Sequence, residues 1–181
     1  MKNLTNLKKT ILLSGMAVCF LTSGIALKAQ VSAGFNRDTL IAAAMEIINA
    51  NQFCALVTID SSGQPQVRSM NPYPMKDDMV IWFATDRKTH KLKEIRNNQK
   101  VSVYWADHSS PKGYVAIAGI AEIIDDVDFL VSMRRQYWDD YGTDWKNNFV
   151  LIKIVPVKMN VVNYARKVYG SPETGTPYVE F

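Results

Sequence analysis

A cluster of basic residues marks the start of a helix that the sequence predicts over Thr89–Asn97. Lys88, Lys91 and Lys93 lie within or beside its first turn, together with the hydroxyl of Thr89. Cations at a helix N-terminus oppose the helix dipole, so this placement is unfavourable for stability alone. It becomes favourable if an anion binds there, held by free backbone N–H groups, the threonine hydroxyl and the ammonium groups. The alternative is an ordinary solvated helix face, which most charge runs are.

Arg68 strengthens the case for an anion, because it lies in the middle of a predicted strand, in the run Val67-Arg68-Ser69-Met70. A buried or half-buried guanidinium needs an anionic partner. An aspartate or glutamate of the same chain could serve, and so could a bound phosphate. A phosphate would satisfy both Arg68 and the basic helix start. The sequence leaves these two partners open.

Other kinds of catalytic site find little support in the sequence. His90 and His108 are the only histidines, and Cys54 is the only cysteine beyond residue 29, which is too few ligands for a zinc cluster. The chain contains no G-x-S-x-G elbow, no P-loop and no G-x-G-x-x-G motif. Its acidic residues are scattered rather than paired. The sequence therefore predicts no metal site and shows no apparatus for classical hydrolysis.

The composition fits one globular domain with a hydrophobic core, since 48% of the 181 residues are hydrophobic and 21% are charged. The formal net charge is +4, and residues 1–29 hold four lysines and no acidic residue. The rest of the chain therefore carries equal numbers of basic and acidic side chains. A neutral body has no general field to attract nucleic acid, so we expect no nucleic-acid partner.

Residues 1–29 are predicted to be a secretory signal peptide. A basic head precedes an uncharged, largely apolar stretch over 11–27, and Ala29 offers a small residue for cleavage. The alternative is an uncleaved anchor helix, but spanning a bilayer takes about 20 mostly apolar residues. We therefore expect export to the periplasm or the extracellular space, with no stable membrane insertion after cleavage.

The remaining chain is predicted to form six strands and few helices. A helix capped by Asp38 precedes the strands, and a further helical segment, besides that over Thr89–Asn97, covers 126–137. The strands, recognised as apolar or alternating runs bounded by turn residues, are Cys54–Ile59, Pro65–Asn71, Met79–Thr85, Val101–Trp105, Tyr114–Ile124 and Phe149–Val155, the last extended past a bulge at Pro156 to Tyr164. Because these strands do not alternate with long helices, they favour an antiparallel barrel over a doubly wound sheet.

The domain boundaries follow from these elements. We expect residues 30–37 to form a mobile junction after the leader and residues 38–165 to form a single barrel domain. Residues 166–181 contain two glycines and two prolines, and they are predicted to form an irregular tail.

The order of several short motifs resembles a known family. These motifs are Phe53–Ile59, Gly63-Gln64-Pro65, Val67-Arg68-Ser69-Met70, Ile81–Thr85, Thr89-His90-Lys91 and Val101–Trp105. Each motif is weak alone, but their shared order and spacing are specific. Over residues 38–164 the chain resembles the pyridoxamine 5'-phosphate oxidase-like flavin-binding split barrels, in particular the general stress protein branch.

This resemblance implies a mainly β fold with flanking helices, in the form of a six-stranded antiparallel split β-barrel. Members are usually homodimers that bind flavin mononucleotide (FMN) in the groove between their subunits. In the family, a strand arginine and a Ser/Thr-x-Lys at the helix start hold the flavin phosphate; the matching residues here are Arg68, Thr89 and Lys91, with Lys88 beside them. The positions implied to lie near the flavin ring are Ser69, Met70, Phe83, Ala84 and Thr85.

The resemblance also implies an activity. We expect an exported FMN-dependent oxidoreductase that exchanges electrons with a small-molecule donor or acceptor. The arginine- and histidine-containing motif that reads the substrate in the true oxidases is not recognisable near Asn163–Val168, so a vitamin B6 oxidase is not expected. His90 stands where relatives often place arginine. The alternatives are a non-catalytic split barrel that binds FMN or haem, and a barrel without cofactor that acts through its dimer surface.

Overall fold

The structure is a computed structural model that describes residues 30–32, 34–109, 112–142 and 144–181. The predicted signal peptide over 1–29 lies outside the described residues. Within the described part of the chain, no helix combines the length and the apolar character needed to cross a membrane.

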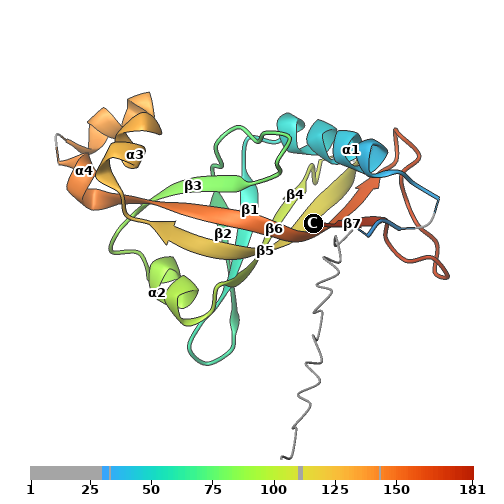
Figure 1. The fold of residues 1–181 in the computed structure, drawn as a ribbon, viewed down its shortest axis with the longest axis horizontal. Coiled ribbons are helices and arrows are strands. Elements are labelled where there is room, and N and C mark those ends of the chain that lie inside the picture. Colours follow the sequence, from blue (N-terminus) through green and yellow to red (C-terminus); the bar gives the residue numbers. More distant parts are fainter. Residues whose placement is uncertain (1–29, 33, 110–111, 143) are drawn as a thin grey trace, which may run out of the picture.

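The described residues form one twisted antiparallel sheet (Figure 1). Its strands are β1 (Cys54–Ile59), β2 (Pro65–Met70), β3 (Ile81–Asp86), β4 (Lys100–Ala106), β5 (Gly113–Ile124), β6 (Phe149–Asn163) and β7 (Tyr178–Glu180). Their order is β2-β1-β4-β5-β6-β3, and the short β7 pairs with β6. Strands β2 and β3 thus stand at the two ends of this order, and among the described residues no ladder joins them. The sheet is therefore split between β2 and β3 rather than closed.

Helices flank the sheet, some of them at the two ends of the long β5–β6 pair (Figure 1). They are α1 (Arg37–Ala50), α2 (His90–Asn97), α3 (Val127–Ser132), the 3-10 helix η1 (Gln136–Tyr141) and α4 (Trp145–Asn148). Helix α1 covers one end of the pair, and α3 and α4 cover the other. The single helical segment predicted over 126–137 is divided, because α3, capped by the Asp126 carboxylate, ends at Ser132 before η1 begins.

The main core lies between α1 and the inward face of the sheet. Leu40 and Ala44 of α1 are fully buried in the same apolar cluster as Leu56 of β1. Side chains alternate across a strand, so Leu56 and its cross-strand neighbour Arg68 share the inward face. The pattern on β2 agrees, because Arg68 and Met70 are half-buried while Val67 between Gln66 and Arg68 is exposed. Strand geometry thus turns a guanidinium toward the inside of the sheet.

Strand β6 continues through Pro156, as predicted, by means of a bulge. The register with β5 shifts beside Gly119, which opposes Pro156, and Val157 has no partner in β5. Proline lacks an N–H donor and is tolerated at such an irregularity. Glycine is needed opposite it, since a Cβ at position 119 would lie 2.7 Å from the carbonyl oxygen of Val155.

Two predicted features were wrong. Helix α1 is capped by Asn36, whose side-chain oxygen accepts the N–H of Thr39 at 2.7 Å, and Asp38 lies in the first turn instead. The segment 166–181 is not wholly irregular, because β7 lies within it and pairs with β6. Val179 of β7 is fully buried. Burial of this apolar side chain therefore stabilises the extra strand in addition to its hydrogen bonds. The sheet consequently has seven strands where six were expected.

The segment predicted as a junction over 30–37 also makes defined contacts. Val31 forms a bridge with Val179, and the N–H of Ser32 donates to the carbonyl of Tyr178 at 3.1 Å. The carbonyl of Gln30 accepts the N–H of Glu180 at 2.8 Å. The beginning of the described chain is therefore attached to β7 at the edge of the sheet.

Candidate functional site

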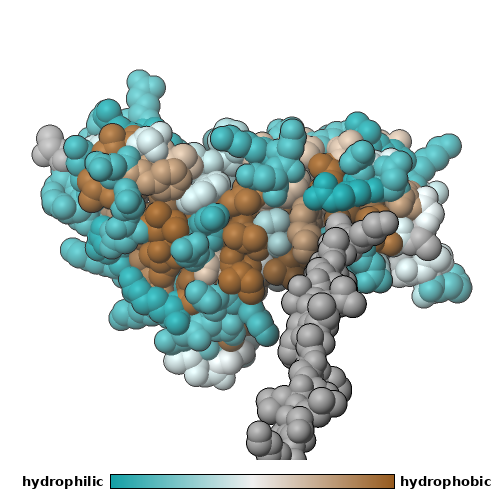
Figure 2. All heavy atoms as spheres, viewed as in Figure 1, coloured by the Kyte–Doolittle hydropathy of each residue, from teal (hydrophilic) through white to brown (hydrophobic). Residues whose placement is uncertain are grey.

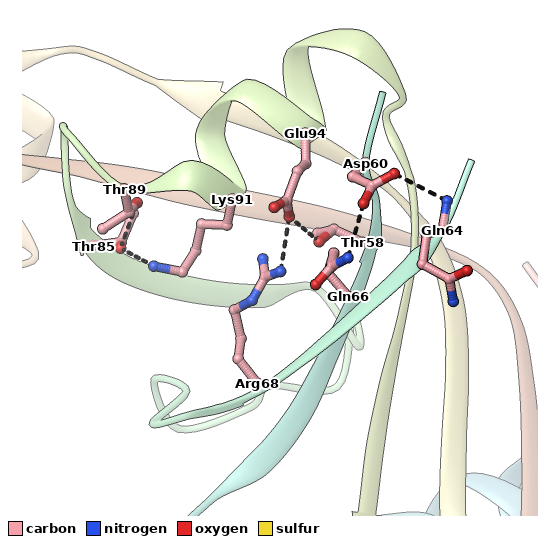
Figure 3. A network of polar contacts seen from close by, with 9 residues as sticks. All are labelled: Thr58, Asp60, Gln64, Gln66, Arg68, Thr85, Thr89, Lys91 and Glu94. Atoms are coloured by element: carbon pink, nitrogen blue, oxygen red, sulfur yellow. Dashed lines mark hydrogen bonds and ion pairs between the residues drawn. The ribbon is translucent and has the colours of Figure 1, made fainter. Parts of the chain in front are cut away.

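The open seam between β2 and β3 brings together the polar side chains that the sequence singled out. Strand β2 supplies Arg68, β3 supplies Thr85 next to its last residue, and α2 is the next element along the chain and supplies Lys91 (Figure 3). One end of the seam is closed by the N–H of Tyr73, which donates to the carbonyl of Trp82 at 2.9 Å. The polar cluster lies on the part of the seam that no ladder closes.

Arg68 has a carboxylate partner, which is one of the two partners that the sequence left open. Its Nη2 lies 2.8 Å from Glu94 Oε2, and the two side chains are 22% and 12% exposed. The other terminal nitrogen, Nη1, is buried and has no hydrogen-bond partner among the described residues. A buried donor left without a partner costs about 1–3 kcal/mol, and more when it is charged. The internal ion pair therefore satisfies only part of this guanidinium.

Lys91 is the second cation of the cluster. Its Nζ donates to Thr85 Oγ1 at 2.8 Å, and Thr85 is buried. Burial lowers the pKa of Lys91, the positive charge of Arg68 lowers it further, and Glu94 and Asp86 oppose the change without reversing it. In Figure 3, Arg68 and Lys91 extend toward the same space from opposite sides. Two cations thus repel each other across a partly buried space.

Some backbone N–H groups at the start of α2 make no hydrogen bond in the described chain. Thr89 occupies the N-cap position, but its side chain makes no capping bond and its hydroxyl donates instead to the carbonyl of Asp86 at 2.9 Å. The Asp86 carboxylate accepts the N–H of Lys88 at 2.6 Å. In the described chain, no hydrogen bond is made by the N–H groups of His90 and Lys91 in the first turn. Such free groups favour an anion at a helix N-terminus.

The other predicted site residues are not part of this cluster. Ser69 lies on the exposed face of β2, and Met70 packs against the main core. Phe83 is fully buried in that core, and Ala84 packs against a second apolar cluster around Trp138. Lys88 is exposed and makes no side-chain hydrogen bond in the described structure. Arg68, Thr85, Thr89 and Lys91 are therefore the predicted residues that lie close together.

Two residues of the cluster were missed by the sequence reading. Glu94 lies one turn after Lys91 on α2, and Thr58 is a buried polar residue on the inward face of β1 whose hydroxyl donates to Glu94 Oε2. Burial acts to raise the pKa of Glu94, but the bonds from Thr58 and Arg68 outweigh it and hold the pKa below its ordinary value. A threonine at an inward strand position was the available signal, since a buried hydroxyl needs a partner.

Asp60 lies beside this cluster, but both of its carboxylate oxygens already accept hydrogen bonds from neighbouring groups. Its carboxylate accepts the N–H and hydroxyl of Ser62, the N–H of Gln64 and the side-chain amide of Gln66 (Figure 3). These hydrogen bonds, led by that of the Ser62 hydroxyl, lower the pKa of Asp60 to about 2. Glu94 is therefore the carboxylate left to pair with Arg68.

Comparison with known proteins agrees with this architecture. The family model described as pyridoxamine 5'-phosphate oxidase matches residues 40–163, more than half of the chain. General stress protein 26 of Bacillus subtilis (strain 168) is 27% identical over 143 residues, which cover 76% of this chain and 99% of that protein. The chain belongs to the pyridoxamine 5'-phosphate oxidase family, and its relatives include general stress proteins.

Solved structures show the same fold. The structure of General Stress Protein 26 from Bacillus anthracis str. Sterne is similar with a TM-score of 0.58 and 25% identity, covering 68% of this chain and 93% of that one. A protein related to general stress protein 26 from Clostridium acetobutylicum gives a TM-score of 0.61 at 17% identity, covering 72% and 92%. The split-barrel fold expected from the sequence is thereby confirmed.

The ion pair predicts a pH-dependent stability. The carboxyl of Glu94 has a pKa below its ordinary value of 4.5, so its charged form contributes stability above that pH, and the contribution is lost as the pH falls through the folded-state pKa. Glu94→Gln should lower the free energy of unfolding by about 1 kcal/mol near neutral pH, because it replaces a charge-assisted bond with a neutral one. Urea denaturation at about pH 7 and about pH 3.5 should show this difference shrinking in acid. A difference of equal size at both pH values would contradict the assignment.

Proposed function

We propose that the chain is an FMN-dependent oxidoreductase that holds the flavin phosphate between Arg68, Lys91 and the start of α2. The observation that carries the proposal is the buried Nη1 of Arg68, which has no partner among the described residues although Nη2 is paired with Glu94. A phosphate oxygen would supply the missing acceptor. Membership of the pyridoxamine 5'-phosphate oxidase family supports the same ligand class.

The charge balance of the cluster favours a phosphate. Arg68 and Lys91 contribute two positive charges, Glu94 contributes one negative charge, and the Asp86 carboxylate also acts on Lys91. A bound phosphate monoester would add negative charge beside both cations and offset the repulsion from Arg68, which together with burial, the larger cause, lowers the pKa of Lys91. Its oxygens could also accept the free N–H groups at the start of α2. These residues therefore fit the phosphate end of FMN.

The proposed chemistry explains the absence of an acid–base pair in the sequence. When bound, flavin itself supplies hydride or single-electron transfer, and the protein anchors it, orients it and excludes water. Arg68 and Lys91 would anchor the phosphate, and the seam would set the direction in which the rest of the molecule extends. The reaction partner is proposed to be a small-molecule electron donor or acceptor.

The phosphate assignment predicts which substitutions weaken FMN binding. Arg68→Ala and Lys91→Ala should each weaken binding by about 1.5–3 kcal/mol, the scale of a charge-assisted hydrogen bond. Lys93→Ala is the matched control, because Lys93 is an exposed lysine on the same helix, and it should bind FMN like the unchanged chain. Quenching of flavin fluorescence measures the dissociation constants. Equal affinity in all four proteins would contradict the site.

Catalysis is tested on the FMN-loaded protein without air. Loss of the yellow flavin absorbance after adding NADH or NADPH would support an oxidoreductase. If FMN binds but neither donor reduces it, the result favours the alternative of a non-catalytic flavin-binding protein. If FMN does not bind at all, both proposals fail.

We further propose that the chain forms a homodimer with the flavin at the subunit interface. Apolar side chains gather over β5 and β6 (Figure 2), where Ile120, Val155 and Val157 are 39%, 43% and 48% exposed. A shallow groove of about 330 Å³ on this outward face is lined by Ile120 and Val157 together with Val57 of β1. Contiguous apolar surface of this kind is typical of interaction sites. The family resemblance implies a homodimer, so the proposed partner of this face is a second copy of the chain.

A charge placed on this face tests the dimer. Ile120→Lys should shift the mass measured by light scattering from two chains to one, because an unpaired ammonium cannot be buried in an apolar interface. Val127→Lys is the control, since Val127 is 48% exposed on α3, away from β5 and β6. An unchanged chain that is already a monomer would contradict the proposal, and so would an Ile120→Lys variant that stays dimeric.

Export remains a proposal that rests on the sequence of the leader. The first described residues support it, because Gln30 and Ser32 already bond to β7 and these contacts do not require residues 1–29. When the full chain is expressed in a bacterium, mass spectrometry of the protein outside the cytoplasmic membrane should find Gln30 as its first residue. A chain without residues 2–29 should stay in the cytoplasm. Recovery of the uncleaved chain in the membrane fraction would favour the anchor instead.

A further inference from the structure

Glu94 occupies a central place in the polar cluster that the phosphate proposal does not explain. A single oxygen, Oε2, forms the ion pair with Arg68 Nη2 and accepts a hydrogen bond from the hydroxyl of Thr58. The side chain of Glu94 is 12% exposed and Thr58 is fully buried. A carboxylate next to a phosphate site would repel the phosphate, so its presence there calls for a compensating role.

We infer that Glu94 is a positioning residue, which holds Arg68 in the orientation that binds the phosphate. This inference rests on the proposed function. Glu94 restrains the long arginine side chain through one nitrogen and leaves Nη1 for the ligand. Thr58 in turn restrains Glu94. The group that would touch the ligand is Arg68, and Glu94 acts through it.

The geometry supports this role over that of a simple ion pair. Arginine and a carboxylate often pair through two parallel hydrogen bonds. Here the bond to Glu94 is made by Nη2, while Nη1 stays buried and without a partner in the described structure. In Figure 3 the Arg68 guanidinium lies below Glu94 and beside the side chain of Lys91, whose ammonium group reaches toward Thr85. Restraining the side chain in advance reduces the rotamer entropy that is lost when the ligand binds.

The opposite role would be competition, in which Glu94 occupies Arg68 until the phosphate displaces it. The hydrogen bond from Thr58 argues against displacement, because it holds the carboxylate from the side of β1. A displaced Glu94 would need another hydrogen-bond donor. Asp60 cannot be that donor, because it is also acidic and its oxygens already accept hydrogen bonds from neighbouring groups. The two roles predict opposite effects when Glu94 is removed.

A set of binding measurements on the full chain separates these roles. Glu94→Ala should weaken FMN binding about tenfold, because Arg68 then loses its restraint. Glu94→Gln should restore the affinity, since its amide oxygen can still accept Arg68 and the negative charge is gone. Thr58→Val, which removes the hydroxyl and keeps the shape, should weaken FMN binding about threefold. Riboflavin, which lacks the phosphate, should bind all of these variants equally.

The same substitution is repeated in a chain without the arginine. In the Arg68→Ala background, Glu94→Ala should cause no further weakening, because Glu94 acts through Arg68. Circular dichroism melting confirms that each variant is folded at the temperature of the titration. The readout is affinity for FMN against riboflavin, which a general loss of stability would change for both ligands alike.

Each outcome decides between the explanations. Tighter FMN binding by both Glu94→Ala and Glu94→Gln would show competition and overturn the inference. Equal weakening by Glu94→Ala with and without Arg68 would also overturn it, because the effect would not pass through the guanidinium. An unchanged chain that binds no FMN would defeat the proposed function itself. If the unchanged chain binds FMN and Glu94→Ala binds it with the same affinity, only the positioning role is overturned.

Discussion

Arg68 lies on the inward face of β2, held by Glu94 through one terminal nitrogen while the other is buried without a partner among the described residues. The rest of the site depends on this partial satisfaction. A guanidinium cannot lose its charge in a protein, so its remaining donor has to be met by another group. Lys91 adds a second positive charge. The pKa of its ammonium group is lowered first by burial and then by the charge of Arg68. The local electrostatics therefore favour an added anion.

The split in the sheet places this arrangement beside two strand edges. Because β2 and β3 stand at the two ends of the strand order, each has an edge over the site that pairs with no other strand of the described chain. Helix α2 follows β3 and places the backbone donors of its first turn at this seam. A closed barrel would have consumed these edges in hydrogen bonds. The polar groups of the site thus lie where the ladder of the sheet is broken.

The sequence predicted the strands well because their apolar runs are short and bounded by turn residues. Strand β1 was predicted with its observed bounds, and β6 was correctly continued through Pro156. The short β7 was missed, since three residues that follow a segment with several glycines and prolines carry no periodic signal. The cap of α1 was placed on Asp38 although Asn36 takes that role, because both residues are good caps and lie close together. Local patterns separate such neighbours poorly.

In the polar site, too, the sequence indicated some residues and missed others. Arg68, Thr89 and Lys91 could be singled out from their types and positions, because a guanidinium in a strand and cations at a helix start are unusual for stability alone. Glu94 could not be distinguished from any other acid on a helix face, since its role depends on how α2 lies over β1 and β2. Likewise, Ser69 is next to Arg68 along the chain but points to the other face of β2, whereas Phe83 shares a face of β3 with Thr85 and packs into the main core instead.

By itself, the amino-acid sequence determined the chemical types that the site contains, the strands that carry them and the alternation that turns Arg68 inward. These depend on contacts between near neighbours and on the two-residue period of a strand. The pairing of Arg68 with Glu94, and the free nitrogen that remains, were decided only by the tertiary structure. That pairing joins residues from two elements whose relative placement is set by packing of the whole sheet, which no local pattern encodes.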